Sequence, residues 1–245
     1  MQVRKYTYSV CVATYNGEKY IEEQLVSIFK QLTDKDEIVV SDDGSKDGTL
    51  AVVESLKQQY PNIKIVKGPQ KGFSCNFENA VKNASCDIIL FSDQDDIWKD
   101  DKVEKINAVF EKEADCTTVL HTMSTFRAGE EEGHEFPISY HSGVFSNWLM
   151  SSYWGCCMAV KREFLLKFLP FREYCVGHDQ LTGLMTEKYG KAYFLDEDLL
   201  MHRLHDSNTS FALPFAKKIK FRLDMLREYL FTNRQYKRNK QKVEK

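Results

Sequence analysis

The first half of the chain alternates short apolar runs with segments whose apolar residues recur at helical spacing, and few folds accommodate this alternation. The apolar runs predict buried strands at residues 8–14, 37–41, 63–66 and 87–92. The segments that follow them predict helices at residues 18–32, 50–60, 72–82 and 98–111. Repeated strand–helix units favour an α/β fold with a mainly parallel sheet and helices on both faces.

Polar loops follow three of these strands in the same sense, at residues 14–17, 42–48 and 93–96. The carboxyl ends of parallel strands meet at one edge of a sheet, where open α/β sheets bind ligands, so we expect these loops to line one rim. Neither a G-x-G-x-x-G after the first strand nor a G-x-x-x-x-G-K-[ST] is present. A metal, rather than a glycine-rich loop, would therefore have to neutralise the phosphates of a bound nucleotide.

The third loop is the most acidic, because Asp93, Asp95 and Asp96 lie within four residues. Three carboxylates this close repel one another, and burying them unpaired is costly, so we expect a cation between them. Hard oxygen ligands suit a divalent cation whose coordination a phosphate-bearing substrate completes. The alternative is a solvated acidic turn that caps the next helix. A second acidic pair at the same rim, Asp42 and Asp43, favours the nucleotide and metal site.

The composition excludes several other classes of protein. The net charge of -2 gives no global field that would attract nucleic acid. No stretch reaches the roughly 20 apolar residues of a membrane span, and no long apolar region follows the N-terminus as in a signal peptide. The seven cysteines are irregularly spaced, which favours reduced thiols in a cytoplasmic protein over a disulfide framework.

The second half is less regular than the first. Its apolar runs predict strands at residues 116–127, 153–160, 192–195 and 199–204, with helices at 162–169 and 177–189. Residues 128–134 are charged and predict the tip of a hairpin, whereas the pattern of residues 145–152 fits neither helix nor strand clearly.

The C-terminal segment, 213–245, predicts a long basic amphipathic helix. Its apolar residues recur at helical spacing, and ten lysines and arginines accompany them between Lys217 and Lys242. One interpretation is attachment to an anionic membrane surface. The other is a helix that packs on its own domain and exposes a solvated basic face. The sequence leaves both open.

Three motifs together resemble family 2 glycosyltransferases of the GT-A fold: Ala-Thr-Tyr-Asn-Gly at 13–17, Ser-Asp-Asp-Gly-Ser-Lys-Asp-Gly-Thr at 41–49, and Ser-Asp-Gln-Asp-Asp-Ile-Trp at 92–98. The resemblance runs from about Tyr8 to Ser210. The third motif is similar to rhamnosyltransferase-like bacterial members that build surface polysaccharides. The implied fold is the Rossmann-like GT-A (nucleotide-diphospho-sugar transferase) fold over residues 1–212, with a nucleotide-binding half, 1–112, and an acceptor-binding half, 113–212.

The resemblance implies roles for the residues that match its motifs on the donor side. Thr14 and Tyr15 correspond to residues at the base and ribose, Asp43 to a residue that hydrogen-bonds the base, and Asp93 to one near the ribose. Asp42 would assist Asp43 or order its loop. Asp95 would bind the metal on the diphosphate, and His205, in a late Arg-x-His motif with Arg203, would lie near the diphosphate or metal.

On the acceptor side, the resemblance places the general base at Asp179, at the start of a helix. The commoner family form there is Glu-Asp, and His178 replaces that glutamate. Asp96 would orient the acceptor or cap a helix. Trp154 is either a packing residue or, together with Gly155, a wall of the sugar pocket.

The implied activity is inverting transfer of a sugar from a nucleoside-diphosphate donor to an acceptor hydroxyl. The donor would be dTDP- or UDP-linked, with dTDP-L-rhamnose suggested by the third motif, and the acceptor a glycan or lipid-linked oligosaccharide. An aspartate base and one divalent cation, Mn²⁺ or Mg²⁺, suffice for a single displacement. A nucleotidyltransferase and a non-catalytic sugar-nucleotide-binding subunit are the alternatives.

Overall fold

The computed structural model describes residues 4–127, 129–130, 133–172, 175–205 and 215–243. Parts of the predicted hairpin tip, 128 and 131–132, lie outside these ranges. So do residues 206–214, which contain the predicted boundary between the domain and its C-terminal helix.

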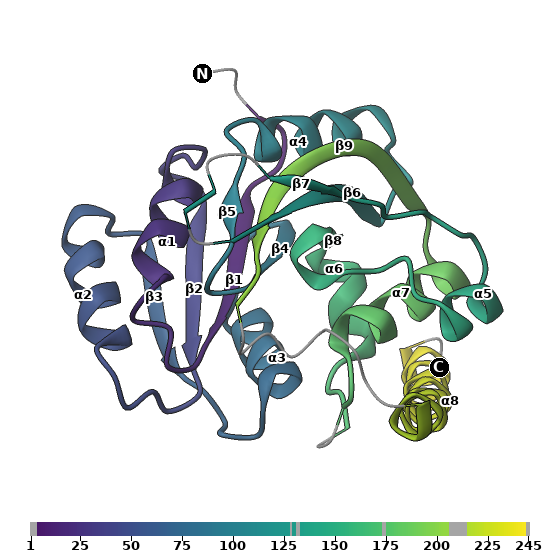
Figure 1. The fold of residues 1–245 in the computed structure, drawn as a ribbon. Helices are drawn as coiled ribbons and strands as arrows, with labels where there is room; N and C mark the ends of the chain where they lie inside the picture. Colours follow the sequence, from purple (N-terminus) through teal and green to yellow (C-terminus); the bar gives the residue numbers. More distant parts are fainter. Residues whose placement is uncertain (1–3, 128, 131–132, 173–174, 206–214, 244–245) are drawn as a thin grey trace.

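The predicted strand–helix units of the first half are confirmed. The parallel strands β1 (Tyr8–Thr14), β2 (Glu37–Asp42), β3 (Ile63–Lys67) and β4 (Ile88–Ser92) lie in the order β3-β2-β1-β4. The helices α1 (Ile21–Phe29), α2 (Thr49–Gln59) and α3 (Phe73–Asn83) connect them. Apolar residues of α1 and α2 pack in one core cluster and those of α3 in another. Both faces of the sheet are therefore covered, as Figure 1 shows.

Strands of mixed direction extend this sheet, and all but one of them come from the second half of the chain. Those strands are β8 (Met158–Lys161), β6 (Thr118–Phe126), β9 (Ala192–Arg203) and β5 (Ile97–Trp98), in that order beyond β4, while β7 (His134–Phe136) pairs with β6. β8 runs antiparallel to both β4 and β6, whereas β6 and β9 are parallel. The pairing of β6 with β9 shifts register near His121 and Thr122, and such irregularities bend strands. β9 accordingly arches over the sheet in Figure 1.

Some predicted element boundaries in both halves of the chain were wrong. The helix expected from Trp98 begins later, as α4 (Lys102–Lys112), because residues 97–98 pair with β9 as β5. The two strands expected at 192–195 and 199–204 are one strand, β9, whose exposed or half-exposed acidic residues at 196–198 interrupt the apolar pattern without ending it. The strand expected from Tyr153 starts as a 3₁₀ turn, η1 (Gly155–Cys157), before β8.

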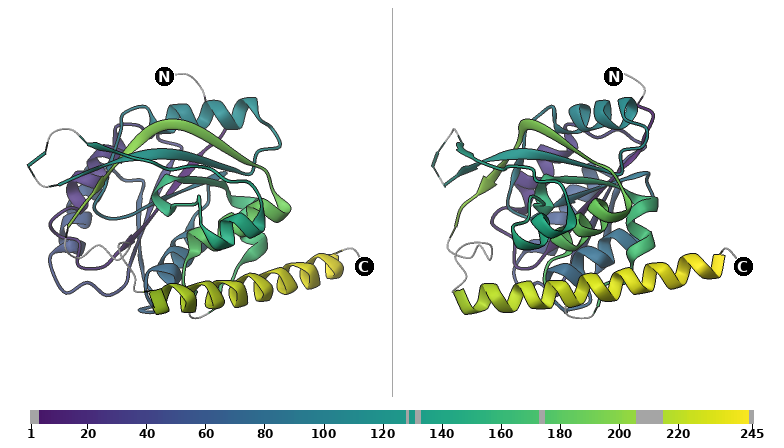
Figure 2. Two further views of the ribbon diagram at one scale, coloured as in Figure 1. Left: turned by 45° about the vertical axis from the view of Figure 1, so that its right-hand side comes forward. Right: turned by 90° about the vertical axis from the view of Figure 1, so that its right-hand side faces the viewer.

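The remaining helices cover one face and one edge of the sheet. They are α5 (Val144–Leu149), which resolves the ambiguous segment, α6 (Arg162–Leu165) with η2 (Leu166–Phe168), α7 (His178–Tyr189) and α8 (Phe215–Val243). The long C-terminal helix predicted from the sequence is thus present, and it runs along one edge of the molecule (Figure 2). In the part of the chain that the structure describes, no helix combines the length and apolar character needed to cross a bilayer.

Candidate active site

Gln94, at the centre of the acidic loop, joins that loop to the one after β1. Its Oε1 accepts a hydrogen bond from the Tyr15 backbone N at 2.9 Å, and its Nε2 donates to the Tyr15 carbonyl at 3.1 Å. A Cβ on Gly17 would lie 2.4 Å from Gln94 Oε1, so any larger residue there would displace the Gln94 amide from these hydrogen bonds. The strands β1 and β4 are neighbours, and Gln94 therefore fixes their two loops against each other at one rim.

The acidic pair after β2 is held by hydrogen bonds within the same rim. Asp42 Oδ1 accepts from the hydroxyl of buried Thr14 at 3.1 Å, and Asp42 Oδ2 accepts from the backbone N–H of Gly44 at 3.1 Å. Asp43 accepts from the backbone N–H groups of residues 70 and 72 at 2.6 and 3.1 Å. Asp42 therefore orders its loop. Each Asp43 oxygen has a second lone pair with which it can accept another hydrogen bond. The Tyr15 side chain, in the loop after the neighbouring strand β1, is 56% exposed.

His205 contacts the acidic loop from 110 residues further along the chain. Its Nε2 lies 2.8 Å from Asp95 Oδ2, and its ring stacks on Tyr20 with 5.3 Å between centroids. Arg203, at the end of β9, donates from Nε to the Asp95 carbonyl at 2.9 Å and from Nη2 to Glu23 at 2.6 Å. Arg203 and His205 thus hold the backbone and the side chain of Asp95 in place, so the Arg-x-His pair contacts the acidic loop.

The acidic loop carries more negative charge than its surroundings neutralise. Burial and the charges of Asp96 and Asp95 raise the pKa of Asp93 well above its usual value. Burial and the charge of Asp96 also raise the pKa of Asp95, although the hydrogen bond from His205 opposes the shift. A bound cation would relieve this repulsion. Asp95 and His205 offer a carboxylate and an imidazole to such an ion.

A second group of potential metal ligands lies beneath the loop. Donor atoms of Asp93, Asp96, Cys156 and His202 all lie within 4.8 Å of one another. Asp96 is fully buried, and its Oδ1 contacts His202 Nδ1 at 2.7 Å and the Arg203 backbone N at 3.3 Å. Asp96 is thus engaged with β9, and it caps no helix.

Asp179 lies in the first turn of α7, half-buried, and its Oδ1 accepts from the Gln180 backbone N at 2.7 Å. After burial and the charges of Asp96 and Asp95, the charge of Asp179 also raises the pKa of Asp93. Asp179 therefore lies close enough to the acidic loop for their charges to interact, although 86 residues separate the two positions in the sequence. The predicted base therefore lies within electrostatic range of the predicted metal loop.

His178 lies in the core beside the base. Its ring is 4% exposed, stacks on Phe77 at 4.2 Å and meets Phe91 edge-on at 5.1 Å. Burial lowers its pKa, so the ring is neutral at pH 7. Rather than opening onto solvent, His178 packs behind Asp179.

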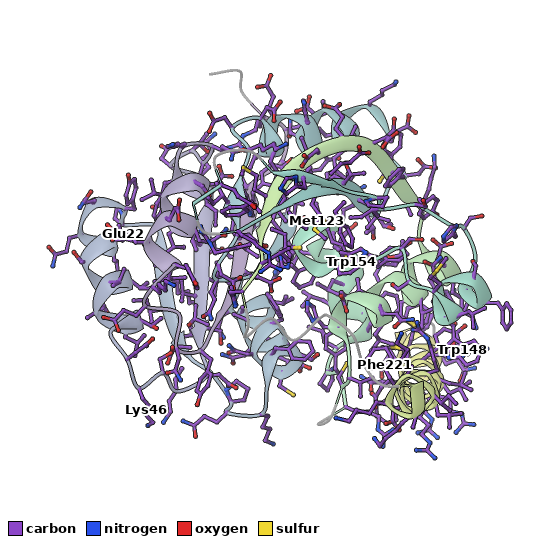
Figure 3. The ribbon with its side chains drawn as sticks, viewed as in Figure 1. Glu22, Lys46, Met123, Trp148, Trp154 and Phe221 are labelled. Atoms are coloured by element: carbon purple, nitrogen blue, oxygen red, sulfur yellow. The ribbon has the colours of Figure 1, made fainter. Side chains whose placement is uncertain are left out.

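Gly155 lies directly against this pair. A Cβ added there would be 3.2 Å from His178 Nε2 and 3.6 Å from Asp179 Cβ. Its neighbour Trp154 is half-buried, packs edge-on against Phe136 with 5.3 Å between centroids, and lies beneath the curled β6–β9 pair (Figure 3).

We expect Gly155→Ala to lower the catalytic rate about tenfold or more, because the His178 ring must give way by a few tenths of an ångström and would shift the adjacent Asp179, the predicted base, with it. The added methyl is tight only against the His178 ring, which needs to move by a few tenths of an ångström, so the melting temperature should change by only a few degrees. Steady-state kinetics, with a melting curve of each preparation, check this. An unchanged turnover number would show that this glycine does not position the base.

Two buried cations near the site were missed at the level of sequence. His202 falls in the strand predicted at 199–204 and Lys102 in the helix predicted at 98–111, and neither was assigned a role. Lys102 is fully buried, donates from Nζ to the Cys156 carbonyl at 2.8 Å and lies 4.1 Å from the centre of the Trp98 ring. Burial lowers its pKa to about 8. In the sequence, the signal that pointed to these cations was the cluster of carboxylates in the acidic loop, because such a cluster requires positive charge nearby.

Comparison with known proteins agrees with this geometry. The sequence profile of the family described as Glycosyl transferase family 2 matches residues 9–169. A curated relative, dTDP-rhamnosyl transferase RfbG of Shigella flexneri, is 29% identical over 248 residues, covering 95% of this chain and 83% of the relative. The Minor teichoic acid biosynthesis protein GgaA of Bacillus subtilis is 29% identical over 147 residues, covering 56% of this chain and 32% of the relative.

Solved structures share the fold. Residues 1–349 of S. aureus TarS in complex with UDP-GlcNAc superpose with a TM-score of 0.69 at 21% identity, covering 94% of this chain and 70% of that one. The mannosyltransferase PcManGT of Pyrobaculum calidifontis, in complex with GDP-Man and Mn²⁺, gives a TM-score of 0.63 at 21% identity, covering 84% and 59%. The rim, its acidic loop and the family match over most of the chain lead to one conclusion: this protein is a glycosyltransferase of the GT-A fold and belongs to glycosyl transferase family 2.

Proposed function

We propose that the protein is an inverting glycosyltransferase that moves a sugar, with dTDP-L-rhamnose as the favoured donor, to a hydroxyl of a glycan or lipid-linked acceptor in bacterial surface polysaccharide synthesis. The observation that best supports this mechanism is the contact between His205 and Asp95 in the acidic loop. Asp93 of the same loop lies within electrostatic range of Asp179. The RfbG relative supports the choice of donor. A cytoplasmic location is part of the proposal, and the seven free cysteines support it.

The donor would lie along the rim formed by the loops after β1, β2 and β4. Thr14, Tyr15, Asp42, Asp43 and Asp93 would bind or frame its base and ribose. Asp95 and His205 would hold Mn²⁺ or Mg²⁺, and their donor atoms together with the excess negative charge around them fit such an ion. When bound, the cation would stabilise the negative charge that the departing diphosphate gains.

The acceptor would approach from the side of α7. Asp179 would take the proton of the acceptor hydroxyl as its oxygen bonds to the anomeric carbon and the bond to the diphosphate breaks. One displacement inverts the anomeric centre, and the products are the glycoside and a nucleoside diphosphate. Trp154, Gly155 and Arg203 would border the sugar, with His178 packed behind Asp179 and Asp96 holding the loop from within.

The donor assignment is tested by melting curves with dTDP, UDP and their sugar conjugates, each with and without Mn²⁺. A ligand at about 100 times its Kd stabilises a protein by about 2.7 kcal/mol, which corresponds to roughly 5–10 °C for a domain of this size. We expect dTDP-linked donors with Mn²⁺ to give this shift.

Melting curves of two variants, recorded with and without Mn²⁺, test whether Asp95 binds the metal. Asp95→Asn should lose the part of the shift that depends on Mn²⁺. Asp198→Asn, which removes a half-exposed carboxylate paired with Lys99, should keep it. A larger shift with UDP-linked donors would overturn the choice of dTDP. Release of pyrophosphate from a nucleoside triphosphate would instead identify a nucleotidyltransferase.

A further inference from the structure

The C-terminal helix α8 has a buried side that attaches it to the fold. Met225 and Thr232 are fully buried, and Glu228 is 4% exposed. The Trp148 indole donates to the Arg222 carbonyl at 2.9 Å. Figure 3 shows Trp148 beside Phe221 at this junction. One side of α8 is therefore packed on the domain. The interpretation of α8 as a helix that packs on its own domain explains this side, but it does not explain the opposite side.

The opposite side of α8 is an exposed apolar stripe. Ile219, Leu223, Leu226 and Leu230 are 48%, 50%, 36% and 41% exposed. Steps of four, three and four residues place them on one line along a helix of 3.6 residues per turn, about half a turn away from the buried residues. Exposed apolar side chains aligned in this way mark an interaction surface, and a solvated basic face does not explain them.

Positive charge surrounds this stripe. The helix contains ten lysines and arginines and two acidic residues. Arg227, Arg234 and Lys237 are exposed and lie beside or in line with the stripe. Asp224, one of the two acidic residues, is paired with Lys220 at 2.6 Å and with Arg227 at 3.2 Å, so it offsets part of this charge. A second copy of the helix would bring like charges together, whereas an anionic lipid surface complements both the apolar line and its basic border.

We propose that the exposed stripe of α8 binds the surface of an anionic lipid bilayer, with the helix lying in the plane of the interface. α8 runs straight along one edge of the molecule, and its C-terminal end extends past the rest of the fold (Figure 2). The stripe faces away from the domain, so the leucines can enter the interface without the helix undocking.

The attachment would also hold the turn that carries the proposed catalytic base one helix diameter, about 10 Å, from the lipid. A Cβ on Gly177, in the turn before Asp179, would lie 3.4 Å from Met225 and 3.5 Å from Phe221 of α8. The helix therefore packs against the turn that carries Asp179, a suitable place for a lipid-linked acceptor. This last step rests on the proposed function, whereas binding to lipid does not.

Flotation of the full chain with vesicles tests the proposal independently of catalysis. We expect binding to vesicles of phosphatidylcholine with about 30 mole per cent phosphatidylglycerol and little binding to phosphatidylcholine alone. Leu223→Ser with Leu230→Ser should weaken binding about tenfold or more, because two apolar anchors are lost. Arg227→Gln with Arg234→Gln should weaken it about fivefold per charge.

Matched controls come from exposed residues elsewhere. Leu50→Ser on α2 removes a leucine that is 38% exposed, and Lys30→Gln with Lys67→Gln removes two exposed cations from other elements. These variants should bind like the wild type. Equal binding by all variants, or equal binding to both kinds of vesicle, would overturn the proposal. So would a stable dimer in light scattering that the two leucine substitutions dissociate, since a second copy would then cover the stripe.

Discussion

Asp179→Asn is expected to lower the turnover number by about 10³-fold while changing the affinity for the nucleoside diphosphate less than about twofold. The amide has the shape of the carboxylate and keeps an oxygen that accepts from the Gln180 backbone N, so α7 should begin as before. It cannot take a proton from the acceptor hydroxyl. Release of nucleoside diphosphate measures turnover, and titration calorimetry with dTDP or UDP measures binding.

Two comparisons make this result specific to the base. Asp198→Asn, a carboxylate on the outer part of β9, should keep wild-type turnover. Asp95→Asn should lose turnover together with metal-dependent donor binding, in contrast to Asp179→Asn. If Asp179→Asn transferred sugar at near the wild-type rate, another group would have to accept the proton.

The parallel half of the fold was predictable because each element there is specified by its own sequence. The run Val10-Cys11-Val12 is apolar enough to be buried on both faces, and the turn at Asn16-Gly17 separates it from a helix with clear periodicity. The rule that ligands bind at the carboxyl ends of such strands then brought the three polar loops to one rim. The contacts of Gln94 and Asp42 agree with that rule.

The mixed half was less predictable because its elements depend on partners far along the chain. Residues 97–98 are a strand only because Leu200 and Met201 lie beside them. β9 continues through three acidic residues because β6 pairs with it on both sides of that interruption. The pairing of His202 with Asp96 spans 106 residues, and the local pattern, a histidine within an apolar strand, was the same as that of an ordinary core histidine.

His202→Ala is expected to lower the free energy of unfolding by about 3–5 kcal/mol, the usual effect of removing one partner of a buried ion pair. Asp96 is fully buried and His202 is 6% exposed, so water cannot replace the lost ring without rearrangement. Asp96 Oδ2 has no hydrogen-bond partner among the residues that the structure describes, which leaves the carboxylate dependent on its contacts through Oδ1. Denaturant unfolding of the metal-free protein measures the change. His134→Ala, which removes a mostly exposed histidine 3.7 Å from Glu130, should cost about 0.5 kcal/mol or less.

The pH dependence separates this ion pair from a simple loss of packing. Burial alone would lower the pKa of His202, but the hydrogen bond to Asp96 and the charge of that carboxylate raise it from 6.5 to about 9. The folded state therefore binds more protons than the unfolded state between these values, and the stabilisation is complete below pH 6.5 and is lost as the pH rises through 9. Wild-type stability should fall across this interval, and His202→Ala should lack that part of the fall.

Adding Asp96→Asn to His202→Ala should recover about 1 kcal/mol or more of the free energy of unfolding, because the unpaired buried charge is removed. If the second substitution only added to the loss, the pair would act through packing, and the charge of the acidic loop would have to be balanced elsewhere.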